Sequence, residues 1–137
     1  MKNPISYNLK QEYIPLIFIG VSFLLAPYFY LHFPAQVPSH WDIHGTVDQY
    51  SSAAFAAFFF PVINLLMYLL LTFIPVIDPE HKRYTEFAHA YVLIKTTIIV
   101  FMACMYVAVS LIGLGYNIPI QQVVPVGVGI LFIVLGN

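Results

Sequence analysis

Four residues that could bind a metal ion or a polar ligand gather in one short stretch, VPSHWDIHGTVDQYSS, residues 37–52. His40, Asp42 and His44 alternate along it, and Asp48 follows. If the stretch is extended, the first three side chains point the same way, because side chains alternate along a strand. Three interpretations remain open: a zinc or copper site, a polar network of carboxylates that accept from histidines and backbone N–H groups, and a ligand-recognition surface.

The metal interpretation has the weakest signal of the three. The spacing of His40, Asp42 and His44 is not one of the standard zinc patterns, and the single cysteine, Cys104, lies within a long apolar run. The chain also lacks the glycine-rich phosphate loop and the zinc-protease helix motif. We therefore expect no enzyme and no cofactor.

The same stretch has the pattern of a folded loop. Prolines before the histidines bias the chain toward extended conformations, Gly45 supplies a turn, and residues 47–50 form a short return segment. Trp41 and Ile43 would then face the helices or the lipid headgroups. One of the two serines at 51–52 would cap the helix that follows.

The composition indicates what surrounds this loop. The 137 residues are 61% hydrophobic and only 8% charged, whereas soluble domains carry about 25% charged residues. This is the composition of a membrane protein. The net charge of −1 provides no basic face for nucleic acid.

Four apolar segments are long enough, or nearly so, to cross about 30 Å of hydrocarbon as helices. The predicted helices cover approximately residues 13–31, 53–77, 79–114 and 118–136, and the loop between the first two covers residues 32–52. We expect an all-α, polytopic membrane protein, with residues 1–137 as a single transmembrane domain. Its four helices would form an antiparallel bundle with a structured extracellular loop.

The charges predict the orientation of this bundle. Lys2 and Lys10 precede the first helix, and Lys82 and Arg83 lie between the second and third, whereas residues 32–52 contain no Lys or Arg. The positive-inside rule then predicts that both termini are cytoplasmic and that the 32–52 loop is outside. The predicted location is the plasma membrane, with the lipid bilayer as a partner.

The loop between the second and third helices contains a helix-start pattern. Asp78 is a suitable cap, Pro79 suits the first helical position, and Glu80 lies near the positive end of the helix dipole. We therefore expect the third helix to begin near Pro79 in the cytoplasm and to enter the membrane around Ala88.

Lys95 is the one charge within the membrane-embedded part of a predicted helix, which for the third helix begins around Ala88. It lies about 10 Å past the expected membrane entry, where a lysine must be paired, hydrated or snorkelling. No acidic residue lies in any predicted span to pair with it. Its ammonium could reach back to the inner interface beside Tyr91, or it could be a functional intramembrane charge.

The loop motif resembles that of a known family. The shared pattern is Pro38-x-His40-Trp41-Asp42-x-x-Gly45-x-x-Asp48-x-Tyr50-x-Ser52. It is similar to the outer-loop motif of the SdpI-like bacterial membrane proteins, in a segment known as a conserved domain of unknown function. A proline-bearing second helix, the inner-loop residues Asp78, Pro79 and Tyr84, and Gly136-Asn137 follow in the family's order.

This resemblance implies an immunity protein. SdpI-like proteins protect the cell from a secreted, membrane-active toxin peptide, and the family's named member also holds a transcriptional repressor at the membrane. Ala53 departs from the family, which often has a basic residue there, and longer members continue into further helices beyond the position of Asn137. The expected partners are a toxin peptide and a cytoplasmic repressor.

Two other functions remain open from the residues. Lys95, the loop histidines and the glycine-containing fourth helix would also suit a small ion, proton or solute transporter subunit. The third hypothesis is a metal-dependent membrane enzyme, and only His40, Asp42 and His44 support it.

Overall fold

A computed structural model describes residues 3–5 and 9–136 of the chain. Lys2 and Asn137, which enter the predictions above, lie outside the described residues, as does the side chain of Lys10. The elements in chain order are α1 (Leu9–His32), β1 (Gln36–Trp41), β2 (Val47–Ser52), α2 (Ala53–Ile77), the 3-10 helix η1 (His81–Thr85), α3 (Ala88–Gly113) and α4 (Ile120–Gly136).

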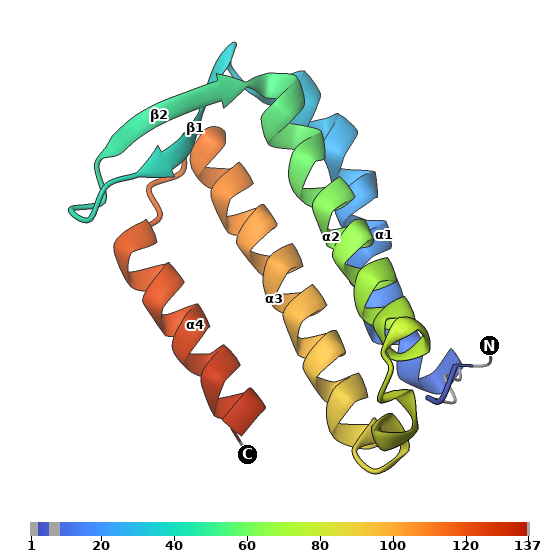
Figure 1. The fold of residues 1–137 in the computed structure, drawn as a ribbon. Helices are drawn as coiled ribbons and strands as arrows, with labels where there is room; N and C mark the ends of the chain where they lie inside the picture. Colours follow the sequence, from blue (N-terminus) through green and yellow to red (C-terminus); the bar gives the residue numbers. More distant parts are fainter. Residues whose placement is uncertain (1–2, 6–8, 137) are drawn as a thin grey trace.

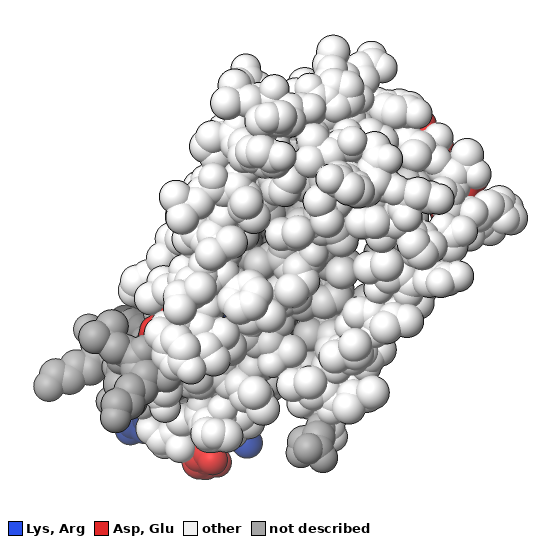
Figure 2. Space-filling model, turned by 180° about the vertical axis from the view of Figure 1, so that it is seen from behind, with Lys and Arg blue, Asp and Glu red and all other residues white. Residues whose placement is uncertain are grey.

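The prediction of a mostly helical membrane protein is confirmed. Three helices, α1 to α3, are long and apolar enough to cross a membrane, and α4 is a shorter apolar helix of 17 residues. Large apolar side chains remain exposed along them; Leu24 is 79% exposed and Ile133 is 72% exposed. Figure 2 shows the charged residues of one face gathered toward the two ends, with an uncharged surface between them. Such a surface suits lipid as its surroundings.

The helices are arranged differently from the expected four-helix bundle. α1, α2 and α3 each pack against the other two, whereas α4 packs, among the described elements, against α3 alone. Figure 1 shows α4 beside α3, and the hairpin of β1 and β2 across one end of the helices. The described part of the chain is therefore a three-helix core with a fourth helix on one side.

The core near the hairpin depends on one close approach. Phe29 of α1, Ala57 of α2 and Tyr106 of α3 are buried together. The Tyr106 hydroxyl donates to the Ala57 carbonyl over 2.8 Å, and the Phe29 and Tyr106 rings meet edge to face at 5.6 Å. The small side chain of Ala57 permits this approach, because it lets the helix backbones come close.

The predicted extended segment, turn and return form an antiparallel hairpin. Val37 pairs with Ser51 and Pro38 with Tyr50, and the register shifts around His40. The turn closes at Gly45, whose φ of 79° favours glycine. Ser52 caps α2, since its hydroxyl accepts from the Phe55 N–H at 3.3 Å.

The predicted start of the third helix near Pro79 is wrong. Asp78 instead follows the end of α2, where its N–H donates to the Ile74 carbonyl, and α3 begins only at Ala88. The Tyr84 hydroxyl donates to the Asp78 carboxylate over 2.9 Å. This bond brings the segment back to the end of α2, and the segment forms a short 3-10 helix. A continuous α-helix from Pro79 would lead away from α2 and could not make this bond.

Candidate functional site

The hairpin brings two of its predicted site residues into direct contact. His40 on β1 and Asp48 on β2 lie 2.6 Å apart, measured from Nδ1 to Oδ1. Their side chains are 59% and 43% exposed, so the pair lies at the surface and is accessible to a ligand. A surface pair of this kind adds little to stability and leaves both groups available for recognition.

Asp42 and His44 have a different arrangement from the one predicted. The Asp42 carboxylate accepts from the backbone N–H groups of His44 and Thr46, each over 2.8 Å. These bonds hold the turn, because an aspartate can bond the backbone two residues further on. Asp42 and His44 therefore belong to the turn and do not continue the strand beside His40.

The metal candidates His40, Asp42 and His44 do not form a metal centre. Across residues 3–5 and 9–136, no three His, Cys, Asp or Glu side chains are grouped closely enough to hold an ion. The reason is local: Asp42 points its oxygen at backbone N–H groups, and His40 is paired with Asp48.

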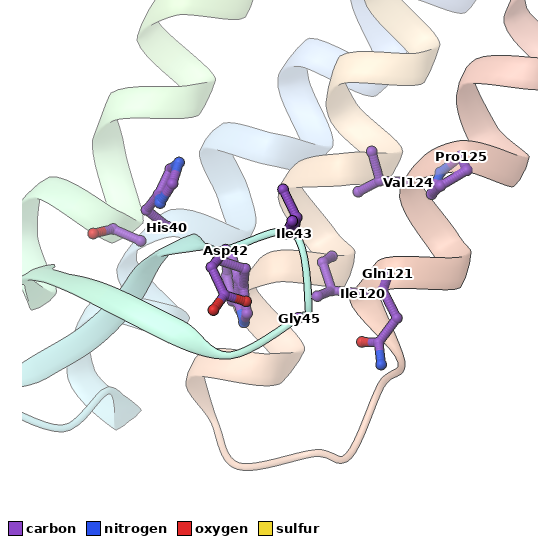
Figure 3. Close-up of a pocket in the computed structure, with 10 residues that line it drawn as sticks. His40, Asp42, Ile43, Gly45, Ile120, Gln121, Val124 and Pro125 are labelled. Carbon is purple, nitrogen blue, oxygen red and sulfur yellow. The ribbon is translucent and has the colours of Figure 1, made fainter.

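A hollow of about 370 Å³ lies between the hairpin turn and the start of α4, and we call it the turn hollow. Figure 3 shows hairpin residues facing Ile120, Gln121, Val124 and Pro125 of α4. The remaining lining comes from residues 39–43 and Gly45. Its wall is mainly apolar, and a few polar side chains, His40 and Gln121 among them, contribute to it. Such a combination suits a ligand that is partly apolar.

Gly45 sets the spacing between the turn and α4. A Cβ atom at this position would lie 2.3 Å from Oε1 of Gln121, closer than any real contact. Its positive φ also disfavours any other residue. The turn therefore favours glycine at position 45, and a larger residue there would also displace the end of the Gln121 side chain.

The aromatic residues of the predicted site differ in their burial. Trp41 is half-buried between the hairpin and the helices, and Tyr50 is 57% exposed. Ile43 is 92% exposed, so it does not pack on the helices. Of the two predicted neighbours, the helices and the lipid headgroups, only the headgroups remain.

Lys95 has the partner that the sequence analysis failed to find. Its ammonium lies 2.8 and 2.9 Å from the two carboxylate oxygens of Glu12, and the side chains are 0% and 9% exposed. The snorkelling interpretation is therefore wrong. The apolar run that predicts the first helix begins at Tyr13 and leaves Glu12 out, but α1 starts at Leu9 and includes it.

Two side chains of α2 complete this charge cluster. The Tyr68 hydroxyl donates to Glu12 over 2.7 Å, and the Lys95 ammonium lies 4.9 Å from the centre of the Tyr68 ring. Thr72 Oγ1 lies 3.4 Å from the same ammonium. The cluster thus joins α1, α2 and α3, and it supplies the hydrogen bonds that a buried ion pair requires.

The inner-loop residues Asp78, Pro79 and Tyr84 lie at the end of the molecule opposite the hairpin. The Asp78 carboxylate accepts from the Glu80 N–H over 2.8 Å as well as from the Tyr84 hydroxyl. Burial and the bond to Asp78 raise the pKa of the Tyr84 hydroxyl above its usual value. The Asp78 carboxylate thus joins the two ends of this turn by hydrogen bonds.

Comparisons with known proteins agree with the hairpin motif. A family profile described as a domain of unknown function, DUF1648, matches residues 17–65. The immunity protein SdpI of Bacillus subtilis (strain 168) is 25% identical over 129 residues, which are 94% of this chain. The chain is thus similar to SdpI-like proteins along most of its length. It spans 59% of the length of that relative, and no solved structure matches it.

The domain match covers only part of the described fold. Residues 17–65 include most of α1, the whole hairpin and the first half of α2, and thus every predicted residue of the hairpin site. Glu12, Lys95 and the residues of α4 that line the turn hollow lie outside it.

Sequence reasoning missed two groups of residues. The sequence did contain a signal for Glu12. A lysine deep in an apolar run requires an acidic partner, and Glu12 lies directly before the first apolar run. Gln121 and its neighbours on α4 carried none, since their approach to Gly45 depends on the tertiary fold.

Proposed function

We propose that this chain is a membrane immunity protein that protects a bacterial cell from a secreted, membrane-active toxin peptide. The observation that carries the proposal is its similarity, over 94% of its length, to an immunity protein. The apolar surface of the helices supports a place in the membrane, where such a peptide acts.

We further propose that the hairpin end faces the outside. The exposed cations Lys82 and Arg83 lie in η1 at the opposite end, and the hairpin segment 32–52 contains no Lys or Arg. The positive-inside rule favours a cytoplasmic position for η1 and for both chain termini. A secreted peptide would then meet the hairpin first.

The turn hollow is the proposed recognition site. Its apolar wall, which includes Trp41 and Val124, could receive an apolar side chain of the peptide, and the exposed His40–Asp48 pair beside it could bond polar groups. Rigid support comes from the Asp42 bonds to the turn. Preformed hollows with a few polar groups are typical of ligand sites.

At the opposite end, the ordered turn of Asp78, Pro79 and Tyr84 is the proposed contact for a cytoplasmic repressor. Its polar side chains bond one another, and Arg83 pairs with Glu80 over 2.7 Å on the exposed surface. A folded polar turn at the inner face would give a soluble partner a defined surface.

The test is survival of a toxin-sensitive bacterium that expresses the chain, with membrane abundance measured for every variant. His40→Ala and Asp48→Ala should lose protection at equal abundance. His89→Ala is the matched control, because His89 is an exposed histidine at the start of α3, away from the hairpin. Loss of protection in the control as well, or none from the intact chain, would contradict the proposal.

A second candidate is an ion or proton transporter subunit, and the buried Glu12–Lys95 pair favours it. Ionisable pairs within the membrane often mark ion or proton pathways. The test is ion or proton flux in proteoliposomes. Flux above empty liposomes that falls in Glu12→Gln and Lys95→Met, at equal amounts of folded protein, would support transport, whereas flux equal to empty liposomes would exclude it.

A further inference from the structure

A second cavity, of about 150 Å³, lies between the hairpin, α2 and the last turns of α3. We call it the aromatic pocket. Five aromatic side chains line it: Phe33, Trp41, Phe55, Phe59 and Phe60. It shares only Ser39 and Trp41 with the turn hollow. It is therefore a separate space, although both cavities lie at the hairpin end.

The pocket is held open by tight packing beside it. Val37 on β1 is 1% exposed, and a Cβ atom at Gly113 of α3 would lie 2.8 Å from Cγ1 of Val37 and 2.9 Å from Cε1 of Phe33. The hairpin thus rests on α3 at a fixed distance. A cavity whose walls are fixed in this way can select a ligand by size.

One polar group within the lining is unusual. Ser51 is paired with Val37 across the hairpin, so the two side chains share the face that points to the helices. The Ser51 hydroxyl oxygen is shielded from solvent and has no hydrogen-bond partner in the described part of the chain. A buried hydroxyl without a partner is unfavourable, so a ligand that supplies one gains affinity.

The size and the walls together indicate the ligand. An apolar cavity of about 150 Å³ holds a benzene molecule, and aromatic walls pack well against another ring. The ring must also carry a group that can bond the Ser51 hydroxyl. A phenol satisfies both requirements, because its ring fits the pocket and its hydroxyl can donate to or accept from a serine.

We propose that the aromatic pocket is a binding site for a single phenolic ring, held between the phenylalanines of α2 and Trp41 and bonded to Ser51. The ring could come from a tyrosine of a peptide or from a free phenol. This inference goes beyond the proposed function, because the site uses another cavity and either proposal can fail alone.

Trp41 makes the test direct, because it is the only tryptophan and lines the pocket. The probes are 4-bromophenol and bromobenzene, whose bromine quenches tryptophan fluorescence, added to the protein in nanodiscs of one lipid composition. We expect saturable quenching with a preference for the phenol. Ser51→Ala should reduce that preference about threefold to tenfold, the effect of one hydrogen bond, and leave bromobenzene binding unchanged.

Three variants locate the effect. Ser22→Ala is the matched control, because Ser22 bonds the Phe18 carbonyl within α1 and does not line the pocket. Ala56→Leu should fill the pocket and abolish saturable quenching by both probes. Val124→Phe should fill the turn hollow and leave the quenching unchanged.

The outcomes separate the possibilities. Equal binding of the two probes, or a phenol preference that survives Ser51→Ala, would overturn the proposal and indicate a space for lipid chains. Quenching that survives Ala56→Leu would also overturn it. A short apolar peptide with one tyrosine that displaces 4-bromophenol, where its phenylalanine version does not, would identify a peptide as the source of the ring. Failure of both peptides, with the Ser51 effect intact, would identify a free phenol.

Discussion

Two of the acid–base pairs in the described part of the chain lie in opposite surroundings. Glu12 and Lys95 are buried between three helices, with side chains 9% and 0% exposed, whereas His40 and Asp48 join two strands at the surface, 43% to 59% exposed. Similar distances therefore have different consequences. A buried charge that loses its partner is strongly unfavourable, and an exposed one is hydrated.

The comparison suggests a division of roles. The buried pair and the hydroxyl of Tyr68 connect the three helices of the core, so a change there should affect folding before it affects recognition. The exposed pair can change without much effect on the fold. Function at the hairpin can thus be tested apart from stability.

The largest effect should come from Lys95→Met. This change leaves the Glu12 carboxylate buried without its cation, and we expect a loss of about 3–5 kcal/mol in the free energy of unfolding. The measurement is unfolding by a denaturing detergent in mixed micelles. Lys82→Met is the matched control, because Lys82 is exposed in η1, and it should change little.

The double variant Glu12→Gln/Lys95→Met sharpens this prediction. Removing both charges should recover much of the loss, since neither partner remains charged and buried. A single Lys95→Met variant as stable as the unchanged protein would contradict the role of the pair. A double variant less stable than the single one would contradict the charge argument.

A medium effect is expected at the hairpin turn. Gly45→Ala and Gly115→Ala both place a side chain at positive φ, 79° and 94°, at a cost of about 1–2 kcal/mol each. Only at Gly45 would the new methyl group also collide with Gln121. Because the colliding atoms are the far end of a flexible side chain, Gln121 can move aside, and the collision should add less than about 1 kcal/mol.

Gln121→Ala isolates the collision. In thermal unfolding of the same preparations, it should recover the additional loss of Gly45→Ala and should not help Gly115→Ala, where nothing lies within 4 Å of the new atom. Equal responses of the two glycine variants to Gln121→Ala would show that the Gln121 side chain does not obstruct a side chain at position 45.

These cases also show which features of the fold can be predicted from the sequence. The apolar lengths predicted the helices, and proline, glycine and serine chemistry predicted the hairpin and the Ser52 cap, because these are local effects. The position of α4 and its contact with Gly45 depend on packing between distant segments, which no local pattern contains. The start of α3 was predicted wrongly because the Tyr84–Asp78 bond overrides a good local cap.

A smaller effect should follow from Ser52→Ala. The change removes the hydroxyl that accepts from the Phe55 N–H at the start of α2, and the cost should be about 0.5–1 kcal/mol. Ser52→Asp is the control, because aspartate is an equally good cap and should preserve the melting temperature. If Ser52→Asp were as destabilising as Ser52→Ala, the cap would not be the reason for the serine.

The smallest effect on stability should come from the exposed pair. His40→Ala and Asp48→Ala should each cost less than about 1 kcal/mol, and a double-mutant cycle should give a coupling of roughly 0.2–1 kcal/mol that falls as salt is added. The same two variants are predicted to abolish protection, so the pair would matter for recognition far more than for folding. A coupling above about 3 kcal/mol would reverse that conclusion. It would mean that the His40–Asp48 pair stabilises the fold as strongly as the Glu12–Lys95 pair does. Lost protection in these variants would then result from a damaged fold.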